Sequence, residues 1–146
     1  MLEKIIKGIK YLLDEENLTA QVIQKKGYEG DFIIPEIVVF QKVAYRVTSI
    51  GESAFEFCSS LTSIVIPDSV TSIGYEAFDG CKSLSTIVIP DGVTSIGDKA
   101  FDGCKSLTSI IFQGTIAQWK EIALDENWKD KVPAKVVHCT DGDVEI

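Results

Sequence analysis

The middle of the chain repeats one pattern of apolar and polar positions three times. The segments 48–70, 71–93 and 94–116 align without gaps, and the second shares 15 of its 23 residues with the first and 13 with the third. A unit of this length cannot bury its own apolar face, but stacked copies can share one continuous core. The pattern therefore predicts a solenoid in which each repeat forms one coil.

Within one repeat, the apolar spacing predicts two short strands joined by tight turns. Residues 84–89 are rich in β-formers and alternate near their end, and Pro90 stops the strand because it has no N–H to donate. Asp91-Gly92 is typical of a turn, and 93–96 predicts the second strand. Residues 98–101 predict a tight helical or 3₁₀ turn. Adjacent coils are expected about 4.8 Å apart along the stack.

The first 25 residues fit two different periods. Apolar residues at positions 2, 5, 6, 9, 12 and 13 are spaced as on one face of a helix. Alternating apolar residues on both sides of the polar segment 14–17 instead predict a β-hairpin from about Ile9 onward. A short helix before Gly8 is compatible with the hairpin.

The C-terminal part carries a helix signal followed by a strand signal. Thr115 and Gln118 have the spacing of a capping box, and Ile116, Trp119 and Ala123 share one face of the helix that would follow. Trp128 is expected to cover the open end of the stack, and 136–137 to add a closing strand. Such caps protect the unpaired edge at a solenoid end, so we expect a complete short solenoid.

The repeated residues resemble a known family. Their pattern, TSIGxxAFxxCxSLxxIxIPxxV, is similar to the BspA-type leucine-rich repeat over 48–116. The resemblance extends loosely to a repeat strand at 32–38, an insertion at 38–47, an N-terminal hairpin within 9–25, and a terminal cap formed by 113–122 and 136–142. It favours the hairpin over the helix near the N-terminus. It also implies a bacterial surface protein with a role in adhesion or protein binding, although a fold of this kind does not specify its target.

The pattern and the resemblance together predict a single domain over residues 1–146. The expected fold is a β-rich, right-handed, leucine-rich-repeat-like solenoid with a parallel β-sheet, short helical or 3₁₀ turns, an N-terminal β-hairpin cap and a C-terminal helix-plus-strand cap. Its expected parts are an N-terminal cap with a degenerate repeat at 1–47, three repeats at 48–116 and a C-terminal cap at 117–146.

The charge and hydropathy of the chain disfavour nucleic acid and membranes as partners. The 22 acidic and 14 basic side chains give a net charge of −8, which disfavours nucleic acid and anionic membranes because phosphate binding needs a basic surface. No apolar run reaches the roughly 18 residues of a membrane span, so we expect no membrane insertion. The chain starts without a secretory signal, and its cysteines fit the cytoplasm. The family resemblance points instead to the cell surface, which we favour without excluding the cytoplasm.

Four cysteines are the most conspicuous chemical candidates. Cys58, Cys81 and Cys104 lie 23 residues apart, so we interpret them as one core position of the repeat rather than as disulfide partners. Zinc sites favour short Cys-x₂₋₄-Cys pairs, and none is present. His138 and Cys139 are neighbours that would point to opposite faces of a strand, which does not suit a nucleophile and its base.

The remaining motifs carry no chemistry. Gly80–Ser83, repeated at 103–106, lacks the spacing of a phosphate-binding loop, and the Asp-Gly pairs lack the closely spaced oxygen ligands of a calcium loop. No two carboxylates stand out as an acid and a base. We therefore expect no cofactor, no metal, no catalytic residue and no enzymatic activity.

One surface remains as a candidate binding site. The main strands would place Leu84, Ile87 and Ile89 inward, and alternation then places Val88 outward beside Thr86. Stacking would align these outward residues into a rigid, mildly apolar stripe edged by hydroxyls. Ordinary β-propensity explains the same residues without a partner. The six residues of the predicted partner-binding stripe are Ser63, Val65, Thr86, Val88, Ser109 and Ile111.

The stripe and the resemblance favour a non-catalytic protein-binding module, surface-associated and adhesin-like, that recognises a protein or an extended peptide. The alternative is a structural spacer or display segment with no ligand of its own, which the short repeat array would suit. The repeat block holds eight acidic and three basic residues, a weak indication of a basic partner. We expect a monomer.

Overall fold

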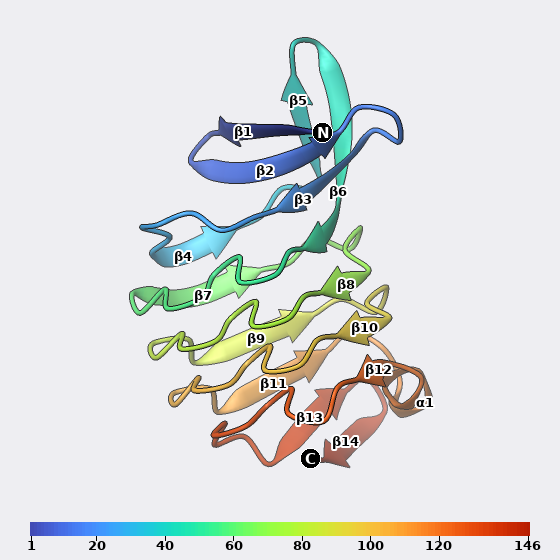
Figure 1. Ribbon diagram of the computed structural model, residues 1–146. Coiled ribbons are helices and arrows are strands. Elements are labelled where there is room, and N and C mark those ends of the chain that lie inside the picture. The colour runs from blue at the N-terminus through green and yellow to red at the C-terminus, as the bar shows by residue number, and fades with distance from the viewer.

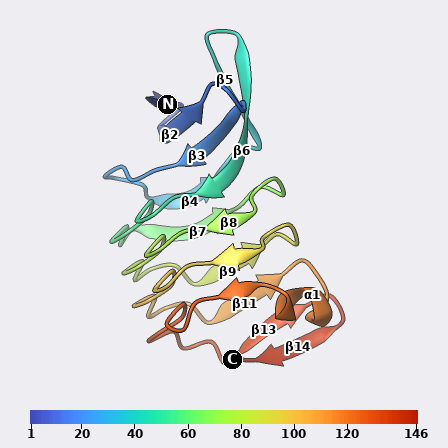
Figure 2. The same ribbon diagram turned by 45° about the vertical axis from the view of Figure 1, so that its right-hand side comes forward.

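The computed structural model describes residues 1–146, and the chain winds into a solenoid whose coils stack from one terminus to the other (Figure 1). Each coil contributes one strand to a sheet on one side and one to a sheet on the opposite side, as the turned view shows (Figure 2). The predicted β-rich repeat solenoid is confirmed. No helix in the structure has the length and apolar character needed to cross a bilayer.

The first side of the solenoid is a six-stranded sheet. Its strands β4, β7, β9, β11 and β13 run parallel, and β14 pairs antiparallel with β13. In order across the sheet they are β14 (Gly142–Glu145), β13 (Val136–Cys139), β11 (Ser109–Phe112), β9 (Thr86–Ile89), β7 (Leu61–Val65) and β4 (Gly30–Ile33).

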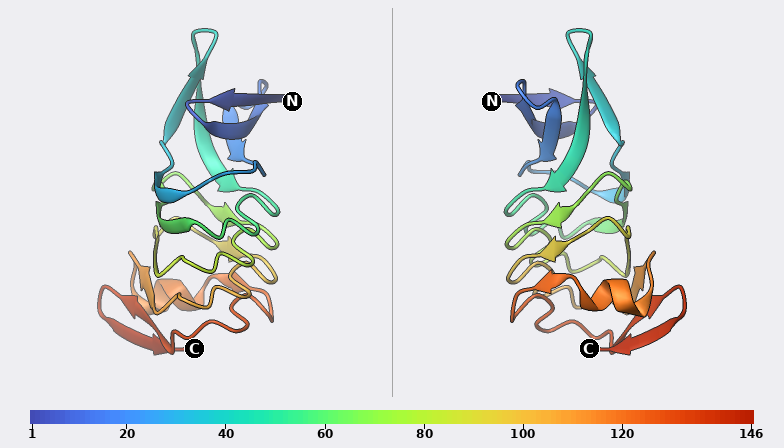
Figure 3. Two further views of the ribbon diagram at one scale, coloured as in Figure 1. Left: turned by 90° about the vertical axis from the view of Figure 1, so that its left-hand side faces the viewer. Right: turned by 90° about the vertical axis from the view of Figure 1, so that its right-hand side faces the viewer.

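The opposite side is an eight-stranded sheet that is antiparallel at its N-terminal end and parallel beyond it. In order it contains β1 (Leu2–Ile6), β2 (Ile9–Asp14), β3 (Thr19–Val22), β6 (Val43–Ile50), β8 (Ser72–Ile73), β10 (Ser95–Ile96) and β12 (Ala123–Leu124), with β5 (Ile37–Phe40) paired to β6. The β5–β6 hairpin projects beyond the coils at the N-terminal end (Figure 3).

Stacked aromatic rings run through the core between the two sheets. The rings of Phe55 and Phe78 lie 5.1 Å apart and those of Phe78 and Phe101 lie 5.3 Å apart, both pairs nearly parallel. Tyr28 packs on Phe55 at the N-terminal end of this column. At the other end the Trp128 ring meets Phe101 edge-on at 6.1 Å and is buried, so the expectation that Trp128 covers the stack is confirmed.

The tight turns of the repeat differ from the prediction. They close by isolated hydrogen bonds, such as the Ala100 N–H donating to the Gly97 carbonyl, and no helix forms there. The reason is that Ser53, Glu76 and Lys99 adopt left-handed φ angles of 56°, 53° and 56°, which interrupt a right-handed helical turn. The glycine before each turn has a packing role: a Cβ on Gly97 would lie 2.6 Å from the Tyr75 nitrogen of the coil below.

The N-terminal end is a three-stranded antiparallel meander. The predicted hairpin from Ile9 is confirmed as β2 and β3, but the possible helix before Gly8 is wrong, because these residues form β1 and turn at Lys7-Gly8 with positive φ angles. The expected strand 32–38 is also wrong in its bounds. It divides between β4 and β5, which belong to different sheets, and the insertion at 38–47 forms the β5–β6 hairpin.

The C-terminal end begins with α1 (Ile116–Lys120), whose capping box is confirmed. The Thr115 Oγ1 accepts from the Gln118 N–H at 3.1 Å, and the Gln118 Oε1 accepts from the Thr115 N–H at 2.8 Å. The helix ends too early for the predicted face, so Ala123 lies exposed in β12 and Ile122 is buried instead. The chain then makes a further coil, in which β13 includes the predicted closing strand at 136–137.

Candidate binding surface

The strand register places the six residues predicted for the stripe in two adjacent columns on the outer face of the six-stranded sheet. Ser63 lies beside Thr86, which lies beside Ser109. Two residues further along the same strands, Val65, Val88 and Ile111 align in the same way. The side chain of Val65 is 54% exposed, and the other five are half-buried by their neighbours.

The register extends both columns beyond the predicted residues. On β4, Asp31 lies beside Ser63, and Ile33 lies beside Val65 with 71% of its surface exposed. On β13, His138 lies beside Ile111. These three residues fall outside the 23-residue alignment, which is why sequence reasoning missed them. The alternation of Asp31, Phe32 and Ile33 was the one available signal for the N-terminal extension.

Each end of the surface carries a polar group held in place by hydrogen bonds. The Asp31 carboxylate accepts from the Ser63 hydroxyl at 2.7 Å and the Thr62 hydroxyl at 3.2 Å, and these bonds lower the pKa of Asp31. At the other end, the His138 Nδ1 lies 2.8 Å from the Asp143 Oδ1, and both side chains are exposed. A shallow hollow of about 350 Å³ lies between the ends of β11 and β13, and His138 is one of its lining residues.

The chemistry of this surface suits recognition rather than reaction. Its columns present methyl groups and hydroxyls on a rigid sheet, and the hydroxyls have no base beside them apart from the Asp31 carboxylate. His138 and Cys139 point to opposite faces as predicted, since His138 is exposed whereas Cys139 packs against the core.

The aligned cysteines are free thiols within the core, as predicted. The Cys81 Sγ donates to the Phe55 carbonyl at 3.1 Å, and the Cys104 Sγ donates to the Phe78 carbonyl at 3.0 Å. Each thiol therefore links its coil to the preceding one. The neighbouring Cys104 thiol and burial raise the pKa of Cys81, which disfavours the thiolate form.

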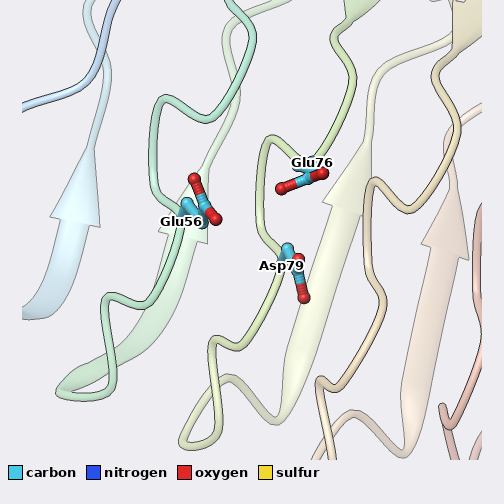
Figure 4. A group of neighbouring side chains, drawn as sticks. All are labelled: Glu56, Glu76 and Asp79. Atoms are coloured by element: carbon cyan, nitrogen blue, oxygen red, sulfur yellow. The ribbon is translucent and has the colours of Figure 1, made fainter.

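A second cluster of polar side chains lies on the turns at the edge of the solenoid. Carboxylate oxygens of Glu56, Glu76 and Asp79 lie within 4.8 Å of one another (Figure 4). Burial and the charges of Asp102, Glu76 and Glu56 raise the pKa of Asp79 to about 6. Glu56, Asp79 and Asp102 share one repeat position, so the alignment held the signal for this column of acids. All three members of the cluster are partly exposed, and such groups of acids are common on protein surfaces without a ligand.

Comparison with known proteins places these features in a family. The profile of the BspA type leucine rich repeat region matches residues 23–130 in six copies. The chain belongs to the BspA-type leucine-rich repeat family. The match begins before the three clear repeats and ends after them, so the degenerate coils at both ends belong to the BspA-type array. A search of curated proteins found no match.

Several solved structures share the fold of this BspA-type chain. A leucine-rich repeat protein from Bacteroides ovatus is 30% identical, with a TM-score of 0.75 over 94% of this chain and 37% of that one. One from Bacteroides capillosus is 26% identical, with a TM-score of 0.77 over 94% of this chain and 97% of that one. A leucine rich cell surface protein from Faecalibacterium prausnitzii is 24% identical, with a TM-score of 0.66 over 97% of this chain and 43% of that one. The chain thus spans well under half of the first and third of these proteins.

Proposed function

We propose that this BspA-type chain is a non-catalytic protein-binding module, acting at the cell surface in an adhesin-like role, and that its recognition surface is the pair of columns on the six-stranded sheet. The observation that carries the proposal is the shared register of Val65, Val88 and Ile111, with the hydroxyl column beside it. Family membership and the description of the Faecalibacterium relative support the surface role.

The spacing of the columns favours a folded partner over a single extended peptide. Neighbouring side chains in one column are about 4.8 Å apart, the distance between strands. A peptide laid along a column repeats its same-face side chains every 6.6 Å or so, which loses register after two coils. A second sheet has the same strand spacing and can pack face to face on the columns. We therefore expect a partner with a flat, mildly apolar β-surface.

The test is a comparison of three forms of the chain. The first is native, the second carries Val65→Glu, Val88→Glu and Ile111→Glu, and a control carries Thr71→Glu, Thr94→Glu and Ala123→Glu. The control positions are exposed and lie on or beside the eight-stranded sheet, so they add the same charge to the opposite side. Circular dichroism checks that all three forms fold.

Partners are captured from host-cell and extracellular-matrix extracts, identified by mass spectrometry, and then measured as purified proteins by calorimetry. We expect the native and control forms to bind one partner and the column variant to lose at least about tenfold in affinity, because three desolvated carboxylates would face an apolar surface. Equal binding by the column variant would place recognition elsewhere. If no form binds any partner, the spacer function is favoured instead.

A further inference from the structure

A cavity lies at the N-terminal end of the solenoid, next to the end of the proposed recognition columns, and shares only Ile33 with them. It has a volume of about 360 Å³, within the range of small-molecule pockets. The β1–β2 turn forms one wall, and the segment from the end of β4 through β5 forms the other. Its lining residues are Ile6, Lys7, Ile9, Tyr11, Ile33, Pro35, Ile37, Val38 and Val39.

The walls of this cavity are almost entirely aliphatic. Ile9, Tyr11 and Val38 are buried, whereas Ile33, Ile37 and Val39 are 71%, 45% and 58% exposed at its rim. Tyr11 also lines the cavity, and its hydroxyl is buried without a hydrogen-bond partner. Covering apolar surface of this kind with an apolar occupant removes it from water, which is favourable. The cavity therefore favours a hydrocarbon group.

The charge around the cavity indicates that the polar group of the ligand is an anion. Lys7 is the single charged residue among the lining side chains, and no carboxylate lines the cavity. Lys7 forms none of the three ion pairs in the structure, which join Lys10 to Glu3, Arg46 to Glu36 and His138 to Asp143. Residues 1–47 hold seven acidic and seven basic side chains, so the whole net charge of −8 resides in the rest of the chain. The N-terminal part of the chain therefore repels an anion less than the remainder of the chain does.

We propose that this cavity binds a small aliphatic carboxylate of the medium-chain fatty acid class. The hydrocarbon chain packs between Ile9 and Val38, and the carboxylate lies at the rim beside the Lys7 ammonium. A cavity of about 360 Å³ has ample room for an eight-carbon chain. The inference does not depend on the recognition columns, because none of its lining residues other than Ile33 belongs to them.

The experiment is a titration with octanoate followed by NMR on the full chain with labelled isoleucine methyl groups. Ile6, Ile9, Ile33 and Ile37 line the cavity, whereas Ile64, Ile87 and Ile110 lie in the solenoid core and serve as internal references. We expect saturable shifts confined to the first four. Octylammonium, which places a like charge beside Lys7, should bind about fivefold more weakly, and Lys7→Gln should weaken octanoate about threefold, as for exposed charge pairs.

Two matched variants locate the site. Val39→Glu adds a carboxylate at the cavity rim and should weaken octanoate binding by about tenfold, since it both repels the ligand and introduces a polar group into the apolar wall. Val43→Glu adds the same charge on the other strand of the same hairpin, where the residue is exposed but does not line the cavity, and should leave binding within about twofold of native.

Several results would overturn the inference. They are shifts that fail to saturate, shifts of equal size in the reference methyls, binding of octylammonium as tight as that of octanoate, or an equal effect of the Val39 and Val43 substitutions. The wild-type titration needs no variant to fold, so the site is tested even if Val39→Glu disturbs the hairpin.

Discussion

The acidic column on the turns makes a specific prediction about stability and pH. Burial raises the pKa of Asp79 from 3.8 to about 6, with further contributions from the charges of Asp102, Glu76 and Glu56 and an opposing one from Lys99. The folded state thus resists ionisation of this carboxyl. We expect Asp79→Asn to stabilise the protein at pH 7, because the amide keeps the shape of the side chain and removes the repelled charge.

The direction of the effect follows from the two pKa values. Above pH 6 Asp79 is ionised in both states, and the folded state bears the full penalty. Below pH 4 it is protonated in both, and the penalty is absent. The stability of the native protein relative to Asp79→Asn should therefore rise as pH falls through 6 toward 4. The pKa values alone correspond to about 3 kcal/mol, and solvent screening of this partly exposed group reduces our expectation to about 1–2 kcal/mol.

The assay is urea unfolding followed by far-UV circular dichroism at pH 7 and at pH 4, with native protein, Asp79→Asn and Asp91→Asn. Asp91 is an exposed turn residue of the same coil, so its substitution controls for the loss of one negative charge. The reasoning is refuted if Asp79→Asn is no more stable than native at pH 7, if its advantage persists at pH 4, or if Asp91→Asn gives the same gain.

Two further predictions concern the core and the C-terminal helix. Phe78→Ala removes the middle ring of the stacked phenylalanine column. It should lower the free energy of unfolding by about 3–5 kcal/mol in the same urea assay. A loss below about 1 kcal/mol would show that the column contributes little to stability. Thr115→Ala removes the side chain that caps α1 and should lower the free energy of unfolding by about 1 kcal/mol. Thr115→Ser keeps the hydroxyl and should stay near native stability. Equal losses in both variants would contradict the capping role.

The repeated part of the fold could be predicted because local and long-range signals agree there. Each repeat strand alternates, and its copies lie one coil apart, so the alignment of Val65, Val88 and Ile111 in the sequence is also their alignment in the sheet. The same periodicity identified the buried cysteines. A stack of identical units leaves few alternative registers, since a shift by one residue would turn the apolar set outward.

The two ends of the chain could not be predicted in the same detail. Their local sequence is compatible with both helix and strand, and pairing with distant segments decides which one forms. Residues 1–6 have an apolar spacing compatible with a helix, and they form β1 because the neighbouring β2 offers an edge for pairing. The turns look helical in sequence until the left-handed backbone of Lys99 and its equivalents is known. The N-terminal cavity has no sequence signature at all, because its walls come from segments about 30 residues apart that meet only in the folded chain.

The constant register of the coils has a consequence for how such proteins change in length. Insertion of one further copy of a repeat between two existing ones would add one side chain to each recognition column and one ring to the phenylalanine stack, while the N-terminal cavity and the capped helix keep their contacts. The extent of the recognition surface is therefore a copy-number property, independent of what each end does. Duplication or loss of a single repeat would lengthen or shorten the recognition surface by one strand, and the contacts between coils would stay the same.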